Sequence, residues 1–141
     1  MAAFNKHQQF AEDVYEKVHN LGSDTLKVVL CNTAPLATNS ILANLTQIAN
    51  GNGYTTGGSQ ATQSSSAQVT GTYKLVLADV VFTASGGTVG PFRYVDLYND
   101  TPTTPADPLI GWWDYGSSIS LAAGESFTTD FDPTTGVLQH V

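Results

Sequence analysis

Short runs of alternating apolar and polar residues, separated by turn residues, fill the second half of this 141-residue chain. The alternation is clear in TYKLVLADVVFTAS (72–85), PFRYVDLYND (91–100) and LIGWWDYG (109–116). A period of two places successive side chains on opposite faces of a β-strand. Glycine and proline between the runs are typical of turns. We therefore predict a mainly β chain, folded as an antiparallel β-sandwich with a jelly-roll-like arrangement.

One of these runs changes its phase near Ala78. Leu75 and Leu77 share one face before that point, whereas Val80 and Phe82 share one face after it. Such a change predicts a β-bulge or a strand that passes from one sheet to another. Further strands are predicted at 25–32, 126–132 and 137–141. The segment 40–50 is ambiguous and could form a short helix capped by Ser40, and 59–71 is either an edge strand or a flexible loop.

The first 22 residues differ from the rest of the chain because their apolar residues follow a helical spacing. Phe10, Val14, Val18 and Leu21 recur every three or four residues, which predicts an amphipathic helix at about 6–19. Phe4 precedes it as an apolar anchor. Two interpretations are open: the helix packs on its own domain, or it is an arm that reaches a neighbouring subunit. We divide the chain into an N-terminal arm and helix, 1–22, and a single β-sandwich domain, 23–141.

Composition and charge argue against several classes of partner. The net charge is −7, with only five lysines and arginines, so we expect no nucleic-acid groove and no binding to an anionic membrane. No stretch is long and apolar enough for a membrane span, and MAAFNKHQQF lacks the apolar core of a signal peptide. The single cysteine, Cys31, ends an apolar strand and is interpreted as a core residue.

The residues that carry catalysis or bind metals are scattered in this sequence. His7, His19 and His140 have no spacing typical of a metal site, so we expect no metal and no other cofactor. The two aspartates of DFDPTTG are interpreted as part of a turn. A glycosidase would have only Asp96 and Asp114 as its pair of carboxylates. We therefore expect no enzymatic activity and no catalytic residues.

The segment LIGWWDYG contains both tryptophans of the chain. Strand alternation predicts that Ile110, Trp112 and Asp114 share one face, and that Gly111, Trp113 and Tyr115 share the other. One tryptophan should then enter the core while the other lies outside or at a subunit contact. The face with Trp113 and Tyr115 remains a possible sugar-binding surface, because aromatic rings can stack on sugars.

The order of several segments resembles small structural proteins of tailed bacteriophages that decorate or cement the capsid. The similar segments are HNLGSDTLKVVLCNTAP, NGYTTGG, TYKLVLADVVFTASGGTVGPFRYVDLYNDT and PLIGWWDYGSSISLAAGESFTTDFD. Together they span most of residues 19–132. The resemblance implies a β-sandwich or jelly-roll module that associates as a dimer or trimer on the capsid shell.

The resemblance further implies a virion protein without enzymatic activity. It would lie on the outer capsid surface, assemble in the host cytoplasm, and bind the major capsid protein and other copies of itself. The alternatives are a tail structural component and a carbohydrate-binding module of the virion. Deleting residues 2–20 is then expected to abolish capsid binding and leave a folded β domain. The residues predicted to form interfaces are Phe4, Phe10, Val14, Val18, Trp113 and Tyr115.

Overall fold

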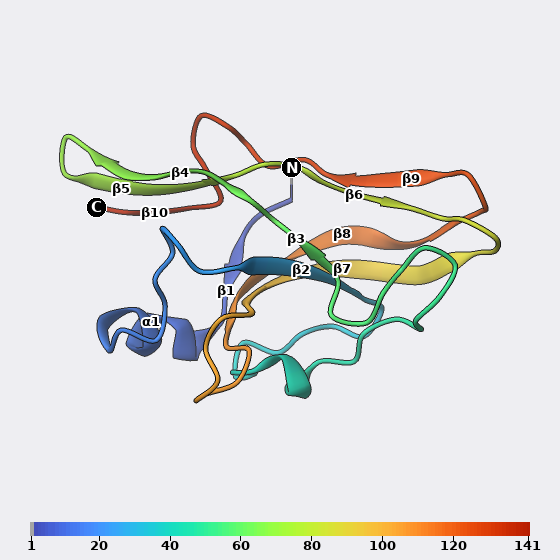
Figure 1. The fold of residues 1–141 in the computed structure, drawn as a ribbon, viewed down its shortest axis with the longest axis horizontal. Helices are drawn as coiled ribbons and strands as arrows, with labels where there is room; N and C mark the ends of the chain where they lie inside the picture. The colour runs from blue at the N-terminus through green and yellow to red at the C-terminus, as the bar shows by residue number, and fades with distance from the viewer. Residues whose placement is uncertain (1) are drawn as a thin grey trace.

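The computed structural model describes residues 2–141 and shows a mainly β chain with antiparallel sheets and one α-helix (Figure 1). The expected mainly β class with a short N-terminal helix is thereby confirmed. The elements are β1 (Asn5–Lys6), α1 (Gln8–Tyr15), β2 (Leu26–Cys31), a 3₁₀ turn (Leu42–Asn44), β3 (Ser59–Gln60), β4 (Gln63–Val69), β5 (Thr72–Leu77), β6 (Val80–Thr83), β7 (Val89–Asn99), β8 (Leu109–Leu121), β9 (Ser126–Thr129) and β10 (Leu138–His140).

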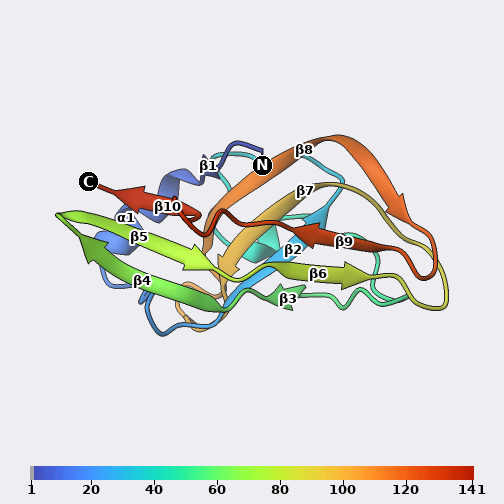
Figure 2. The same cartoon turned by 90° about the horizontal axis from the view of Figure 1, so that it is seen from above.

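The strands form two layers with the main core between them. One layer is a five-stranded sheet in the order β1-β8-β7-β2-β3. The other consists of a three-stranded sheet, β10-β5-β4, and a two-stranded sheet, β6-β9 (Figures 1 and 2). The sheets do not close on each other, and the jelly-roll order is not confirmed.

The predicted phase change near Ala78 is confirmed. The chain leaves the three-stranded sheet at the end of β5 and enters the two-stranded sheet at the start of β6. Leu77 and Val80 are both buried although they are three residues apart, because the backbone between them is not a regular strand. Of the two alternatives for 59–71, the edge strand is the one that forms: β4 lies at the edge of its sheet.

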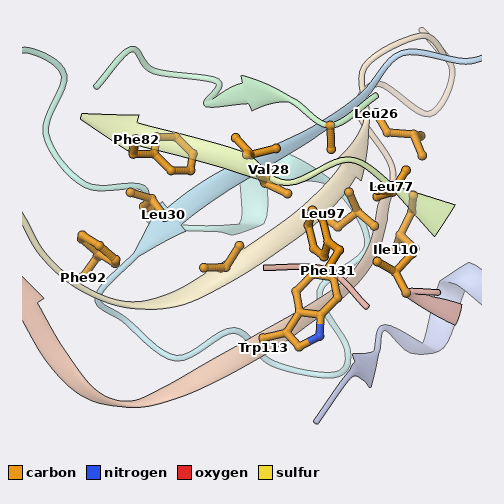
Figure 3. Close-up of a cluster of buried hydrophobic side chains, with 14 of the residues drawn as sticks. Leu26, Val28, Leu30, Leu77, Phe82, Phe92, Leu97, Ile110, Trp113 and Phe131 are labelled. Atoms are coloured by element: carbon orange, nitrogen blue, oxygen red, sulfur yellow. The ribbon is translucent and has the colours of Figure 1, made fainter. Parts of the chain in front are cut away.

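The core between the layers takes side chains from both of them. Leu26, Val28 and Leu30 of β2 meet Leu77 and Phe82 of the opposite layer (Figure 3). The other face of β2 is half-buried at Lys27 and fully buried at its two apolar residues. There Val29 and Cys31 form a second cluster, which confirms Cys31 as a core residue.

The ambiguous segment 40–50 contains a single 3₁₀ turn and no longer helix. The Asn44 carboxamide oxygen accepts hydrogen bonds from the backbone N–H groups of Ser40 (3.0 Å) and Ile41 (3.2 Å). Leu45 then returns to an extended backbone, with ψ at 152°, so the helix does not continue. Leu42 in this turn and Leu45 directly after it pack on the second cluster.

Strand β8 carries two irregularities that alternation alone did not predict. Gly111 pairs with Leu97 and Leu109 pairs with Tyr98, which leaves Ile110 as an extra residue. The prediction that Ile110 shares a face with Trp112 is therefore wrong: the bulge turns Ile110 into the main core together with Trp113.

The second irregularity lies further along the same strand. Asp114 pairs with Tyr94 and Ile119 pairs with Phe92, so residues 115–118 bulge outward opposite the single residue Arg93. Strand β7 also begins at Val89, two residues before Pro91. The alternating run identified in the sequence begins at Pro91, but in the structure Pro91 lies inside the strand, at a register shift where it needs no ladder hydrogen bond.

The N-terminal segment is part of the β domain. Strand β1 pairs with β8 through Asn5 opposite Trp112 and Lys6 opposite Gly111. A side chain on Gly111 would overlap the Phe4 ring, so the close approach of the two strands needs glycine there. Of the two interpretations left open, the structure has the helix packed on its own domain.

Helix α1 is shorter than the range predicted from its apolar spacing. It runs from Gln8 to Tyr15, whereas the prediction was about 6–19. Lys17 has a positive φ of 64°, a backbone conformation that cannot continue a right-handed helix. Val18 therefore lies beyond the helix, half-buried.

Candidate functional site

The residues predicted to form interfaces gather around two hollows on the surface. Phe4, Phe10 and Val14 line one hollow, and Trp113 and Tyr115 line the other. Val18 belongs to neither of them. The first hollow, here called the α1 groove, has a volume of about 460 Å³, and the second, the β8–β9 hollow, about 160 Å³.

The α1 groove lies between the N-terminal helix and the last strand. One side of the groove is lined by Phe10, Ala11, Val14 and Tyr15 of α1, and residues 138–140 of β10 lie across from them. Phe10 is buried and belongs to the main core, so it forms the floor of the groove. Tyr15 is 74% exposed and stands at the rim.

The β8–β9 hollow is lined by residues of β7 and β8 from one layer and of β9 from the other. Its floor is Trp113, which is only 6% exposed and packs against Phe4 and Phe131 with ring centroids 5.3 and 5.4 Å away. Its rim is Tyr115, which is 54% exposed and meets Phe127 edge-on. A sugar that stacked at this hollow would therefore meet the ring of Tyr115 and not that of Trp113.

The predicted split of the two tryptophans onto opposite faces is confirmed. Trp113 enters the main core, whereas Trp112 is half-buried on the other face of the sheet and packs on the His7 ring at 4.6 Å. Asp114 lies on the Trp112 side at the surface. Its carboxylate accepts two hydrogen bonds from the Arg93 guanidinium, at 2.8 and 3.0 Å, which lower its pKa together with the Gly116 N–H.

Asp96 and Asp114 do not meet in a common cleft. Asp96 is fully buried, whereas Asp114 is at the surface and bound to Arg93. A glycosidase needs two carboxylates that both face the sugar between them. Asp96 cannot contact a substrate in this arrangement.

Asp96 instead forms a buried pair with His7, which the sequence did not indicate. The His7 Nε2 and Asp96 Oδ2 atoms are 2.9 Å apart, and both side chains are fully buried. Burial raises the pKa of Asp96 to about 6, while the hydrogen bond from His7 opposes that rise. This pair fastens the start of α1 to the middle of β7.

A second buried polar cluster fastens the end of the N-terminal segment. The Asn99 amide donates to His19 Nδ1 (3.1 Å) and to Asp24 Oδ2 (2.6 Å). His19 Nε2 lies 4.0 Å from Asp13 Oδ2, and burial lowers the pKa of His19. Both clusters join residues 7–24 to β7, so the segment is fixed to the sheet at two points.

Neither cluster has the composition of a metal centre. Within residues 2–141, no group of three or more His, Cys, Asp or Glu side chains could hold a metal ion. The helices of this part of the chain are all too short or too polar to cross a membrane. No protein-family model, curated protein sequence or solved structure matches the chain.

The raised pKa of Asp96 predicts how the effect of Asp96→Asn on the free energy of unfolding depends on pH. The folded chain holds the Asp96 proton up to about pH 6, whereas the ordinary pKa is 3.8. The carboxyl group therefore stabilises the fold fully below about pH 4, and this contribution is lost as pH rises to 6. Asparagine does not titrate. We expect the stability of the unsubstituted chain relative to Asp96→Asn to fall by about 2–3 kcal/mol from pH 4 to 7.

Urea unfolding at four pH values between 4 and 7 measures this difference. Asp130→Asn is the matched control, because it makes the same side-chain change at an exposed aspartate. Parallel pH profiles for Asp96→Asn and the unsubstituted chain would mean that Asp96 is not buried as described.

Proposed function

We propose that this chain is a non-enzymatic capsid decoration protein of a tailed bacteriophage, with the finer architecture of a β-sandwich. It binds the outer surface of the assembled shell and stabilises the contacts between capsid subunits. Its partners are the major capsid protein and other copies of the chain. The segments of residues 19–132 that resemble such proteins are the starting point for this proposal.

The observation that carries the proposal is the pair of open apolar hollows. Exposed apolar surface of this kind is typical of sites where another protein binds. The hollows are bordered by Tyr15 and Tyr115, two of the large apolar side chains that remain exposed. Tyrosine is enriched in protein interfaces because its ring buries a large area while its hydroxyl stays hydrated.

A carbohydrate-binding module of the virion, in the tail or the head, is the second candidate. The exposed Tyr115 ring beside the β8–β9 hollow favours it, because one free aromatic face can stack on a sugar ring. Trp113 is the floor of that hollow and offers no free face.

Binding to capsids that lack this protein tests the two candidates. Purified chain is mixed with such capsids, and bound and free chain are separated by sedimentation. We expect saturable binding and a rise in the melting temperature of the capsid, because a ligand of the assembled shell stabilises it by mass action. No sedimentation with capsids, together with quenching of tryptophan fluorescence by glycans, would favour the carbohydrate-binding candidate instead.

A further inference from the structure

The α1 groove has features that suit an extended, apolar peptide segment. The inference drawn from them rests on the proposed function. The edge strand β10 forms the side opposite α1, and Lys6 of the edge strand β1 also lines the groove. Strand β10 pairs with β5 on one side only, and β1 pairs with β8 on one side only, within the described chain. Main-chain groups along an open edge can pair with an added extended strand.

The floor of the groove is apolar over most of its length. Phe10, Val14 and Leu138 contribute to it, and they belong to or pack against the main core. A volume of about 460 Å³ is within the range of pockets that bury whole ligands. The groove can therefore bury several apolar side chains that point inward from an extended segment.

The charge of the groove is opposite to the charge of the molecule. The chain has 12 aspartates and glutamates against five lysines and arginines, yet within residues 2–141 no carboxylate lines the groove. Its basic side chains are Lys6 and His140. Lys6 is exposed and forms no ion pair with the described residues. A carboxylate on the bound segment would complement this charge.

We propose that the α1 groove receives an extended, apolar segment of the capsid subunit. The main chain of that segment pairs with β10, its apolar side chains cover Val14 and Phe10, and a carboxylate on it meets Lys6. Tyr15 closes over the segment from the rim, where its hydroxyl already lies 3.3 Å from His140 Nε2. Figure 2 shows β10 and α1 at the same end of the molecule, away from the turn between β8 and β9.

Two substitutions with matched controls test the groove in the capsid sedimentation assay. Ala11→Trp fills the groove from an exposed position of α1, and Lys6→Glu reverses its charge. The controls are Ala123→Trp, at an exposed site in the turn between β8 and β9, and Lys17→Glu, which makes the same charge change outside the groove. All four positions are exposed, and circular dichroism melts verify that the variants fold.

We expect Ala11→Trp to weaken capsid binding at least ~10-fold and Lys6→Glu about 5-fold, with both controls within about twofold of the unsubstituted chain. The loss caused by Lys6→Glu should shrink as salt is raised, since an exposed ion pair is screened. If both groove variants bind as tightly as their controls, the groove proposal fails and the decoration function stands. If the unsubstituted chain binds no capsid, the decoration function fails and the proposed occupant fails with it.

A photo-crosslinking side chain at position 15 identifies the occupant. Bound capsids are irradiated and the crosslinked peptides are identified by mass spectrometry. We expect one segment of the capsid subunit that contains an aspartate or glutamate. Crosslinks that join two copies of this chain, with none to the capsid subunit, would overturn the proposal and make the groove a contact between copies.

Discussion

A chain without residues 2–20 is expected to lose cooperative folding. The deletion removes His7 and leaves the Asp96 carboxyl group buried and without its partner. Breaking a buried pair in this way costs about 3–5 kcal/mol. It also removes Phe10 from the core, where burial is worth about 1.5–3 kcal/mol, and Phe4, which packs partly buried against that core. These losses together are comparable to the whole stability of a typical domain, about 5–15 kcal/mol.

Circular dichroism and the dispersion of amide resonances measure this outcome. We expect the truncated chain to show no cooperative melt near the transition of the complete chain. A chain that lacks only Ala2 and Ala3 is the matched control, because both are exposed, and it should melt within a few degrees of the complete chain. A soluble truncated domain with a sharp melt would mean that the N-terminal segment is a detachable arm after all.

This expectation differs from the one drawn from the sequence, and the reason is physical. The helical spacing of Phe10, Val14 and Val18 predicts an apolar face but does not say which surface covers that face. A helix on its own domain and a helix on a neighbouring subunit have the same pattern. Contacts made by Phe4 and His7 with residues about 90 to 110 positions away decide between them.

The β pattern was predictable where each strand keeps a regular period of two. The two faces of β2 and the opposite placement of Trp112 and Trp113 follow from alternation alone. The phase change near Ala78 was also visible in the sequence, because buried residues on either side of it are out of step. These features depend on one strand, so the local sequence contains enough information to predict them.

The bulges and the buried polar pairs depend on two segments and could not be predicted in the same way. Ile110 is an extra residue only in comparison with the register of β7, and nothing in its own strand marks it. His7 and Asp96 are 89 positions apart, and no spacing rule connects them. His19 and Asn99 are likewise separated by 80 positions. The two histidines of the N-terminal segment are visible in the sequence, but the sequence alone does not identify their buried partners on β7.

Replacing Trp113, which is buried, is expected to destabilise the fold far more than replacing Trp112, which is half-buried. Trp113→Ala is expected to destabilise the fold by about 3–5 kcal/mol, because it leaves a cavity between Phe4 and Phe131 in the main core. Trp112→Ala is expected to cost roughly 1–2 kcal/mol, because Trp112 is half-buried and loses mainly its contact with the His7 ring.

Urea unfolding of the two variants under the same conditions measures both values, and fluorescence provides an independent check. The single-tryptophan chain Trp112→Phe should emit at shorter wavelength than Trp113→Phe, because its remaining indole is shielded from water. An equal or larger loss of stability in Trp112→Ala would contradict the placement of Trp113 in the core. The β8–β9 hollow would then lose its floor, and both tryptophan rings would have to be considered as binding surfaces.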